Sequence, residues 1–579
     1  MSNRRLHTGR DRGPASTRWT DHFMTRRELA FAADRERRRP GRRRSERGYV
    51  AVTTAILMIL FVAIAALGID TAIWYTRANQ LQRAADAAAL AGVTKMPRFA
   101  DARALAIQTA TNNRFDASQV TVELIPNSPR QLRVKVAASV PSFFGTFLHS
   151  GTNLVREATA EYVPKIELGS KLNAIGTGNN NVYGAQGFWL SINGFCAPKE
   201  NGDRFASYFE GNLTGTPRCN DLTAPATRNN EYPGDTAAEY TYVVNLPCPD
   251  ASNPCTATTL TDYVVEIFDP WFDRTNESVD VNPFDYSLYP TEYVNAAATL
   301  TANLRDDDGN IMGTAGYGSC GEASVACADV ANSTWHPMFV IPAGRPAGRY
   351  RIEMRTSPGE AYSYGTNSFG LAVHAAGLPG PCSGPSCPTI SGETSMSVYA
   401  NTTGTADFYL AKLSPARYYR GKKIRVRLWD PGEGAQTIQI LAPTNAAAPG
   451  DYVPTAFTYG GGDPGIASHP NSDNNWTSAG PVTALDVSGL ASTLPDALTP
   501  AAPWPASERI NDSRYNGRMV EMKLQIPTDY GCASPTPPCV EVTPPLDGWY
   551  KIRYISSFPF DVTTWSVDIV GDPVHLVHE

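Results

Sequence analysis

The chain has 579 residues, of which 42% are hydrophobic and 18% are charged. At roughly 150 residues per domain, this length excludes a single small core and predicts three or four domains. The abundance of Gly, Pro, Thr, Ser and Asn in the second half is typical of loop-rich β structure. Charge is uneven, because residues 1–48 hold 15 Arg against 6 acidic residues while the whole chain has a formal net charge of −6. The two ends therefore face different surroundings.

Residues 1–48 predict a disordered, Arg-rich cytoplasmic tail. The cluster "RRRPGRRRSER" gives the segment a strong positive charge, whereas aromatic residues are few and no fold is recognisable. A topology signal is the favoured role, and no nucleic-acid partner is expected. Met24 is an alternative start to Met1, because the sequence that follows it already carries the positive cluster.

An uncharged apolar run follows, from Val50 to Ile69. Its 20 residues, at about 1.5 Å each, match the ~30 Å hydrocarbon core of a bilayer. Arginines precede it and the aromatic residues Trp74 and Tyr75 follow it, as at a membrane interface. We expect one transmembrane helix over 49–70 in the cytoplasmic membrane, with the N-terminus cytoplasmic and the C-terminal region outside.

A cleaved signal peptide is the alternative to an anchor, with a small-residue site at 63–65. The apolar run is longer than a usual signal peptide core, and helix-forming sequence continues through the site. An uncleaved anchor is favoured.

The Ala-rich sequence after the anchor predicts a helical stalk. Small residues at three-to-four spacing would permit close packing of a neighbouring helix, or would pack on the next domain of the same chain. Both alternatives stay open from the sequence. The residues that line this face are Ile73, Leu81, Ala84, Ala88 and Ala91.

The stretch from Arg43 to Gly92 resembles the N-terminal segment of TadE/TadG-like proteins of Flp (Tad) pilus assembly. The resemblance implies a membrane-anchored protein that has other pilus-assembly proteins as partners. Pilin-like relatives carry a Glu five residues beyond a cleaved Gly, whereas here Gly48 is followed at that distance by Thr53; this departure fits a TadG-like protein that stays anchored. The motif residues are Gly48, Asp70, Gln80, Leu81, Asp86 and Gly92.

Many TadG-like proteins also carry a von Willebrand A module with a D-x-S-x-S metal motif. The nearest match here, at 486–490, has Leu490 where the second Ser is required. No such metal site is expected.

Residues 71–165 predict the stalk and a small α+β domain. A helix is expected near 100–112, then a hairpin formed by "QVTVELIP" and "QLRVKVAASV", and a third strand in "REATAEYV". The segment 141–150, "PSFFGTFLHS", is expected to be a loop or a short turn. Two of its Phe residues either pack in the core, which is favoured, or are exposed and mark a contact site. The Gly/Asn-rich stretch 176–187 is expected to be a linker.

Two weakly similar halves follow, which we expect to be β-sandwich-like domains at 166–380 and 381–579. "DYVVEIFDP" is similar to "KIRVRLWDP", "MFVIP" to "KLQIP", and "AGRYRIEMRTS" to "DGWYKIRYISS", and each half ends in an apolar strand. The order is kept while the offsets grow, which indicates duplication with insertions in the loops.

All ten cysteines lie beyond residue 195, and four short pairs suit small disulfide-closed loops next to Gly or Pro. Zinc knuckles would need closer spacing and fixed His partners, and free buried thiols are the remaining alternative. Disulfides place this region in an oxidising compartment. The candidates, taken in order as pairs, are Cys196 and Cys219, Cys248 and Cys255, Cys320 and Cys327, Cys382 and Cys387, and Cys532 and Cys539.

Familiar catalytic, phosphate-binding and redox motifs are missing from the sequence, so we expect neither an enzyme nor a cofactor. The acidic run at 306–310 suits calcium in part, but it lacks the full spacing of a calcium loop and a solvated turn is favoured. Sequons at 212, 276, 332, 401, 475 and 511 fit exposed loops. Aromatic runs such as "YFEGN" and "FTYGGGD" suit either surface contacts or a sandwich core.

Together these patterns predict a mainly β protein with an N-terminal transmembrane helix, a small α+β domain and two β-sandwich-like domains. The resemblance implies Tad/Flp pilus assembly or surface presentation through protein contacts. The alternative is a tethered surface adhesin or carbohydrate-binding protein with a glycan or protein ligand.

Overall fold

The structure is a computed structural model that describes residues 47–577 with internal gaps. Strands hold 46% of its residues and helices 18%, which confirms the predicted mainly β class with an N-terminal helix. The gaps are residues 97, 126–127, 143–150, 164, 181, 196–198, 200–201, 208–227, 250–256, 269–298, 319–333, 358–365, 401, 433–434, 445–450, 462–477, 479, 488–517, 557–560 and 572–573.

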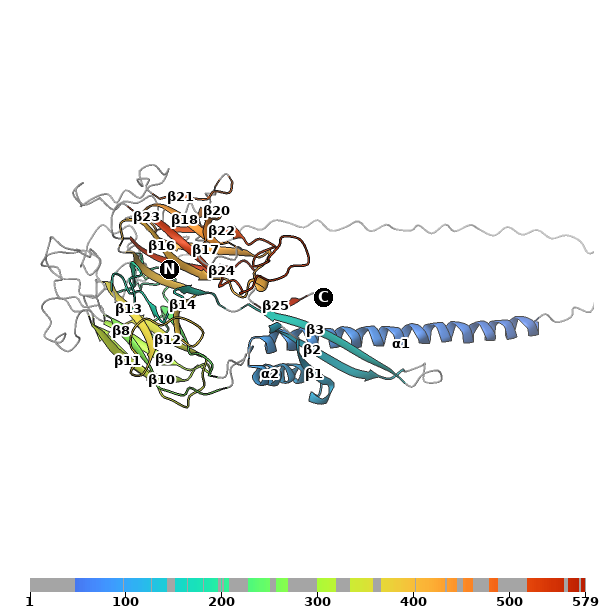
Figure 1. The fold of residues 1–579 in the computed structure, drawn as a ribbon. Coiled ribbons are helices and arrows are strands. Elements are labelled where there is room, and N and C mark those ends of the chain that lie inside the picture. Colours follow the sequence, from blue (N-terminus) through green and yellow to red (C-terminus); the bar gives the residue numbers. More distant parts are fainter. Residues whose placement is uncertain are drawn as a thin grey trace, which may run out of the picture. The chain divides into compact units, whose positions relative to one another are not determined.

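Two helices open the described chain (Figure 1). Helix α1 (Arg47–Val93) contains the predicted anchor and the predicted stalk as one element of 47 residues. Within its apolar part, the hydroxyl of Thr53 donates to the backbone oxygen of Tyr49 at 2.9 Å, so this polar group is satisfied inside the helix. Helix α2 (Phe99–Asn112) follows a short turn, close to the predicted 100–112.

A four-stranded antiparallel sheet packs with the helices. Its order is β1 (Val120–Ile125), β2 (Ser128–Val140), β3 (Thr152–Tyr162) and β25 (Val574–Val577). The first three strands are the predicted hairpin and third strand, with Val120 opposite Val136 and Ala138 opposite Leu154. The fourth strand comes from the C-terminus, which was expected to belong to the second sandwich. We call α1 from Trp74, α2 and these four strands the anchor-linked module.

The core of the anchor-linked module combines small helix residues with larger strand residues. Ala102 and Ala106 of α2 and Leu132 and Val134 of β2 are completely buried in one cluster with the second part of α1. Alanines let the helices approach closely, and alternating β-branched residues present one apolar face of the sheet.

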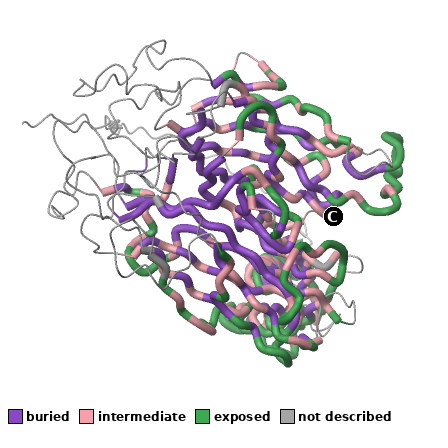
Figure 2. Tube along the Cα trace, turned by 60° about the vertical axis from the view of Figure 1, so that its left-hand side comes forward, coloured by how far each residue is buried: buried purple, intermediate pink, exposed green. Residues whose placement is uncertain are grey.

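The rest of the chain forms two facing layers of strands, which we call the sandwich body. Figure 2 shows that buried backbone runs through its strands. Its strands are β4 (Glu167–Gly169), β5 (Ala174–Ile175), β6 (Phe188–Asn193), β7 (Tyr240–Asn245), β8 (Tyr263–Phe268), β9 (Thr299–Arg305), β10 (Ile311–Gly318), β11 (Trp335–Ile341), β12 (Arg349–Thr356), β13 (Thr366–Ala375), β14 (Thr389–Glu393), β15 (Ser395–Ala400), β16 (Gly404–Lys412), β17 (Lys423–Trp429), β18 (Ala435–Pro443), β19 (Tyr452–Pro454), β20 (Phe457–Gly461), β21 (Leu485–Asp486), β22 (Met519–Gln525), β23 (Trp549–Ser556) and β24 (Asp561–Ile569).

Each layer runs through both sequence halves. The first pairs in the order β10-β9-β12-β7-β14-β4-β16-β23-β18, with β19 and β21 on β18. The second pairs in the order β11-β8-β13-β6-β15-β24-β17-β22-β20, with β5 on β13. The layers form one connected network, because β14 and β15 pair at Glu393 and Ser395.

The two halves repeat one plan, as their sequence similarity predicts. The similar segments "DYVVEIFDP" and "KIRVRLWDP" form β8 and β17, each of which lies between two strands of its own half. Likewise, β12 lies between β7 and β9, and β23 lies between β16 and β18.

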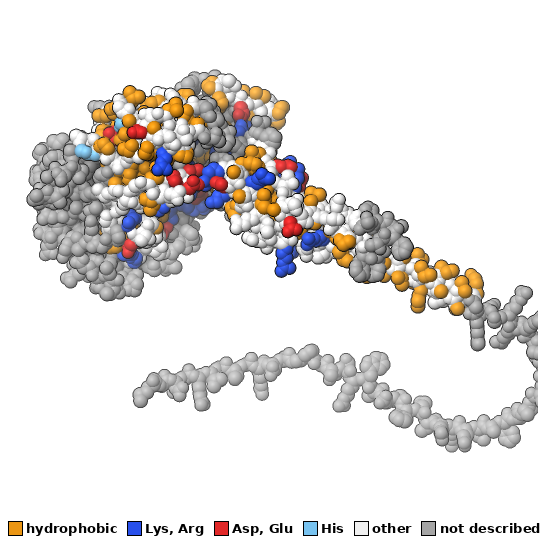
Figure 3. All heavy atoms as spheres, turned by 90° about the horizontal axis from the view of Figure 1, so that it is seen from below, with side chains coloured by type: hydrophobic (Ala, Val, Ile, Leu, Met, Phe, Trp, Pro, Cys, Tyr) orange, Lys and Arg blue, Asp and Glu red, His pale blue; other side chains and the backbone are white. Residues whose placement is uncertain are grey.

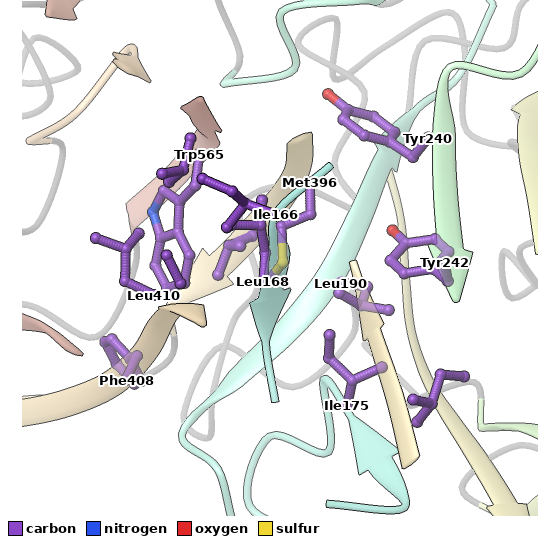
Figure 4. Close-up of a cluster of buried hydrophobic side chains, with 14 of the residues drawn as sticks. Ile166, Leu168, Ile175, Leu190, Tyr240, Tyr242, Met396, Phe408, Leu410 and Trp565 are labelled. Atoms are coloured by element: carbon purple, nitrogen blue, oxygen red, sulfur yellow. The ribbon is translucent and has the colours of Figure 1, made fainter. Parts of the chain in front are cut away.

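The halves exchange their first strands. Strand β4 is the first strand of the first half but pairs with β14 and β16 of the second. Strand β14 is the first strand of the second half but pairs with β4 and β7 of the first. Buried residues from both halves form one hydrophobic cluster, part of which Figure 4 shows around Leu168, Met396 and Trp565. The predicted boundary at 380/381 falls between β13 and β14, in a chain whose two sandwiches share one core.

The stretch 176–187 is not a linker. Tyr183 is 1% exposed, and Gly178, at φ +50°, lies so close to the Trp189 ring that any side chain there would clash with it. The glycines that favour a linker in the sequence instead allow this loop to pack tightly on β6.

Candidate functional site

The first part of α1 is an exposed apolar rod. Within the described residues, α1 is the helix long and apolar enough to cross a membrane, and none of its most apolar window is buried. The exposed end of α1 seen in Figure 3 carries hydrophobic side chains. This agrees with the predicted span from Val50 to Ile69.

The second part of α1 is buried and belongs to a hydrophobic core. Asp70 directly follows the apolar run and is buried. From Ala78 onward, residues at helical spacing are buried, and the motif residue Leu81 is completely buried in the core of the anchor-linked module. One continuous helix therefore supplies both the apolar span and part of a folded domain.

The polar motif residues position α1 locally. The Gln82 side-chain amide donates to Asp86 Oδ1 at 2.8 Å and to the backbone oxygen of Glu157 in β3 at 3.1 Å. Arg77 donates to Gln80 Oε1 at 2.8 Å. Two of these hydrogen bonds orient side chains along α1, and the bond to Glu157 attaches α1 to β3.

Gly92 sets the closest approach between α1 and its neighbours. A Cβ atom at this position would lie 2.6 Å from Leu132 Cδ2, 2.8 Å from the backbone oxygen of Ala102 and 2.9 Å from Ala106 Cβ. Only a residue without a side chain fits between β2 and α2. Gly48 lies in the first turn of α1.

The predicted stalk face packs on its own chain. Leu81, Ala84 and Ala88 are at most 1% exposed and belong to the core of the anchor-linked module. Ile73 is 39% exposed and Ala91 is half-buried. At the three buried positions, the face contacts the next domain of the same chain.

The motif residues thus lie in one helix that joins an apolar rod to a compact domain, and this segment can be compared with known families. Residues 48–102 match the model of the TadE/G-like Flp pilus-assembly family. The N-terminal segment is TadE/G-like. No curated protein and no solved structure matches the chain.

The match covers α1 and the start of α2 but ends before the sheet that completes their core. Val134 and Ala160, which lie beyond the match, are completely buried in the same cluster as Leu81. The TadE/G-like segment therefore depends on later residues for its packing.

A charged group on the sheet of the anchor-linked module was not predicted. Glu161 of β3 is 8% exposed and lies 3.9 Å from His575 of β25 and 3.7 Å from Lys422 of the sandwich body. The only sequence signal for β25 is the alternation of apolar Val574 and Leu576, which pack against the module core.

The acidic run at 306–310 forms a turn. Asp306 accepts from the backbone nitrogen of Asn310 at 2.8 Å and from its side-chain amide at 3.0 Å. Asp307 and Asp308 pair with Arg98, which precedes α2. These carboxylates are engaged in turn and ion-pair contacts, as the favoured turn interpretation expects.

Two predicted disulfides lie in the described part of the chain. Cys382 bonds to Cys387 and Cys532 to Cys539, with Cα–Cα distances of 5.7 and 5.3 Å. Cys248 is also disulfide-bonded. Lying outside the described residues are Cys196, Cys219, Cys255, Cys320 and Cys327, the six sequons, the loop 143–150 and most of the aromatic runs.

A buried polar cluster joins strands of the sandwich body. Asp203 accepts from Tyr240 at 2.5 Å and from the backbone nitrogen of Asn193 at 2.8 Å, and the hydroxyls of Tyr240 and Thr564 lie 3.1 Å apart. Burial raises the pKa of Asp203 to about 6. Burial and then the charge of Asp203 raise the pKa of Glu239 well above its ordinary value. This cluster ties β6, β7 and β24 together.

Proposed function

We propose that this protein is a single-pass membrane protein that serves Tad/Flp pilus assembly or surface presentation through protein contacts outside the membrane. The observation that carries the proposal is α1. Its TadE/G-like segment combines an apolar span with the core of a folded domain in one helix. Such a helix would link the membrane to a folded domain that other assembly proteins can contact.

The proposed orientation places the Arg-rich tail in the cytoplasm and residues 70–579 outside. The positive flank before the span supports it, since positive residues concentrate on the cytoplasmic side. The disulfides of the sandwich body support it independently, because they persist in oxidising compartments. Labelling of Ser45→Cys by a membrane-impermeant maleimide should fail in intact cells and succeed after lysis; labelling in intact cells would reverse the topology.

We propose a non-catalytic role for the sandwich body. Its buried carboxylate Asp203 accepts several hydrogen bonds within the fold, and its acidic turn is paired with Arg98. These groups serve to hold strands and turns in place.

The test is deletion of the gene in its native host, scored by electron microscopy for pili. We expect loss of pili, rescue by the full chain, and no rescue by residues 71–579 secreted behind a cleavable signal peptide. Rescue by the anchorless chain would separate assembly from the membrane helix. Normal piliation without the gene would refute the pilus role.

A second candidate function is a tethered adhesin that binds carbohydrate. The specific observation is an aromatic and cationic patch on the sandwich body, where the Tyr409 ring lies 5.1 Å from Lys171 Nζ and 5.3 Å from Lys551 Nζ. Lys551 also lies 4.1 Å from the Tyr452 ring. Lys171 also pairs with Asp547 at 3.2 Å, so the half-buried rings lie beside both cations and a carboxylate, an arrangement that suits stacking on a sugar ring.

Adhesion of cells that carry Tyr409→Ala should fall if this patch binds glycans, whereas Thr405→Ala, an exposed change on the same strand, should leave adhesion unchanged. Equal adhesion of both variants in a host that retains pili would remove the second candidate.

A further inference from the structure

The chain passes from the anchor-linked module to the sandwich body and back at two neighbouring positions. The chain exits the module at Tyr162, the last residue of β3, and returns at Val574, the first residue of β25. These two residues are direct partners in the β3–β25 ladder. More than 400 residues therefore lie between two positions that are adjacent in space.

The anchor-linked module and the sandwich body have separate cores. The buried cluster of the module draws on α1, α2, β1, β2 and β3, with Val574 and Leu576 of β25 packed against it. The buried cluster of the sandwich body begins at Ile166 and ends at Val567, between the exit and the return. A domain with its own core and adjacent ends can be inserted into a host domain without disturbing it.

Contacts between the two parts include polar and cation–π pairs. Arg98 Nε lies 3.7 Å from Asp307 Oδ2, and Lys422 Nζ lies 3.7 Å from Glu161 Oε1. The Arg130 guanidinium lies 4.3 Å from the centre of the Tyr418 ring. The Arg98 pair is partly exposed, whereas Glu161 and Tyr418 are buried. These contacts are polar or cation–π in kind, and the apolar clusters of the two parts stay separate.

We infer that the sandwich body is an inserted, autonomous display domain, and that β25 is not its final strand but the last strand of the anchor-linked module. The module is then a discontinuous unit that needs the C-terminus of the chain to complete its sheet. The domain that faces the surroundings can vary in size or binding surface while the membrane-linked unit stays unchanged.

This inference is independent of the pilus role, because it concerns which parts of the chain fold and act as units. It also bears on truncation experiments. A chain cut after Pro164 lacks β25 as well as the sandwich body, so it leaves the β3 edge without its partner strand. Loss of function in such a chain would not show that the sandwich body is needed.

The test uses hydrogen–deuterium exchange of the full chain in detergent micelles. Leu132→Ala opens a cavity in the module core, and Ile552→Ala opens one in the body core; both residues are completely buried. We expect Leu132→Ala to speed exchange in β1, β2 and β25 by about a hundredfold and to leave β17 and β23 unchanged. Ile552→Ala should show the reverse pattern. If either variant speeds hydrogen exchange by the same factor in the module strands (β1, β2 and β25) and in the body strands (β17 and β23), the inference is overturned.

A second measurement protects the test against a variant that fails to fold. Specific protease sites are placed in both connectors, beside Val163 and Gly571, and the folded full chain is cut in membranes. We expect the double cut to release a soluble sandwich body with unchanged exchange in β17 and β23, while α1 stays in the membrane fraction. A released body that loses this protection or aggregates would show that it depends on the module and would overturn the inference.

Discussion

Glu393 holds the exchanged strand β14 in place, and its loss should weaken the junction between the two halves. Its side chain is 2% exposed, and its carboxylate pairs with Arg349 of β12, with Lys165 at 3.0 Å and with Arg351 at 3.6 Å. Burial by itself would raise the pKa of Glu393, but Arg349, Lys165 and Arg351 outweigh burial and hold that pKa below its ordinary value.

Glu393→Gln removes the buried negative charge and leaves three cations facing a neutral amide. Breaking a fully buried ion pair costs about 3–5 kcal/mol. Here Arg349 and Arg351 keep 27% and 29% of their side chains exposed and Lys165 keeps 60%, so water offsets part of the loss. We expect the free energy of unfolding to fall by about 2 kcal/mol at pH 7.

The pH dependence gives a separate check. A carboxyl whose pKa is lowered by folding stabilises the fold above its unfolded pKa, near 4.5, and this contribution is lost as the pH falls through the lower, folded-state pKa. The difference between wild type and Glu393→Gln should therefore shrink on acidification below about pH 4.5.

Urea unfolding between pH 3 and 7, followed by tryptophan fluorescence, measures both effects. The matched control is Glu353→Gln, which breaks the pair with Arg305 at the surface of the same layer, where both side chains are at least 25% exposed. It should cost less than about 1 kcal/mol. Equal losses in the two variants, or a Glu393→Gln difference that persists at pH 3, would refute the reasoning.

Three further predictions follow from other sites. Gly92→Ala should lower the free energy of unfolding of the anchor-linked module by about 1–3 kcal/mol, because the new Cβ atom would overlap Leu132 and α2. Gly68→Ala should be neutral, because a Cβ atom there would have no neighbour within 4 Å. Hydrogen exchange protection in β2 measures the effect of both variants. Folding raises the pKa of Asp203 from 3.8 to about 6, so stability should fall by roughly 3 kcal/mol as the pH rises from 4 to above 6, and Asp203→Asn should abolish this component in pH-dependent urea unfolding. Replacing Cys532 and Cys539 by Ser opens a short loop and should cost about 2 kcal/mol, and reductant should then have a smaller effect on the thermal midpoint than in wild type.

Local chemistry explains what could be predicted near the anchor. An uncharged apolar run, an arginine flank and strongly helix-forming residues define α1 without reference to any distant residue, and the TadE/G-like motif lies within it. The alternation in "QVTVELIP" and "QLRVKVAASV" likewise predicts β1 and β2, because period-2 patterning reports one buried face of a strand.

The function of several residues depended on distant partners and could not be predicted. The sequence left open whether Leu81, Ala84 and Ala88 face a second helix or their own domain, since both use the same small, apolar surface. Gly178 favoured a linker, because a sequence does not show that the Trp189 ring fills the space beside it. The role of Gly92 became clear only when β2 and α2 were placed against it.

By itself, then, the sequence determined the elements that periodicity encodes: the membrane-length helix, the strands of the small domain and of the similar segments, the order of the two halves and the short cysteine pairs. Beyond the predicted hairpin of β1 and β2, only the tertiary structure decided which strands are neighbours. Strand β25 belongs to the module that begins hundreds of residues earlier, and β4 and β14 each pair with the opposite half. The physical reason is that side-chain periodicity specifies which face of a strand is buried, whereas backbone hydrogen bonds, which carry no residue identity, join the edges.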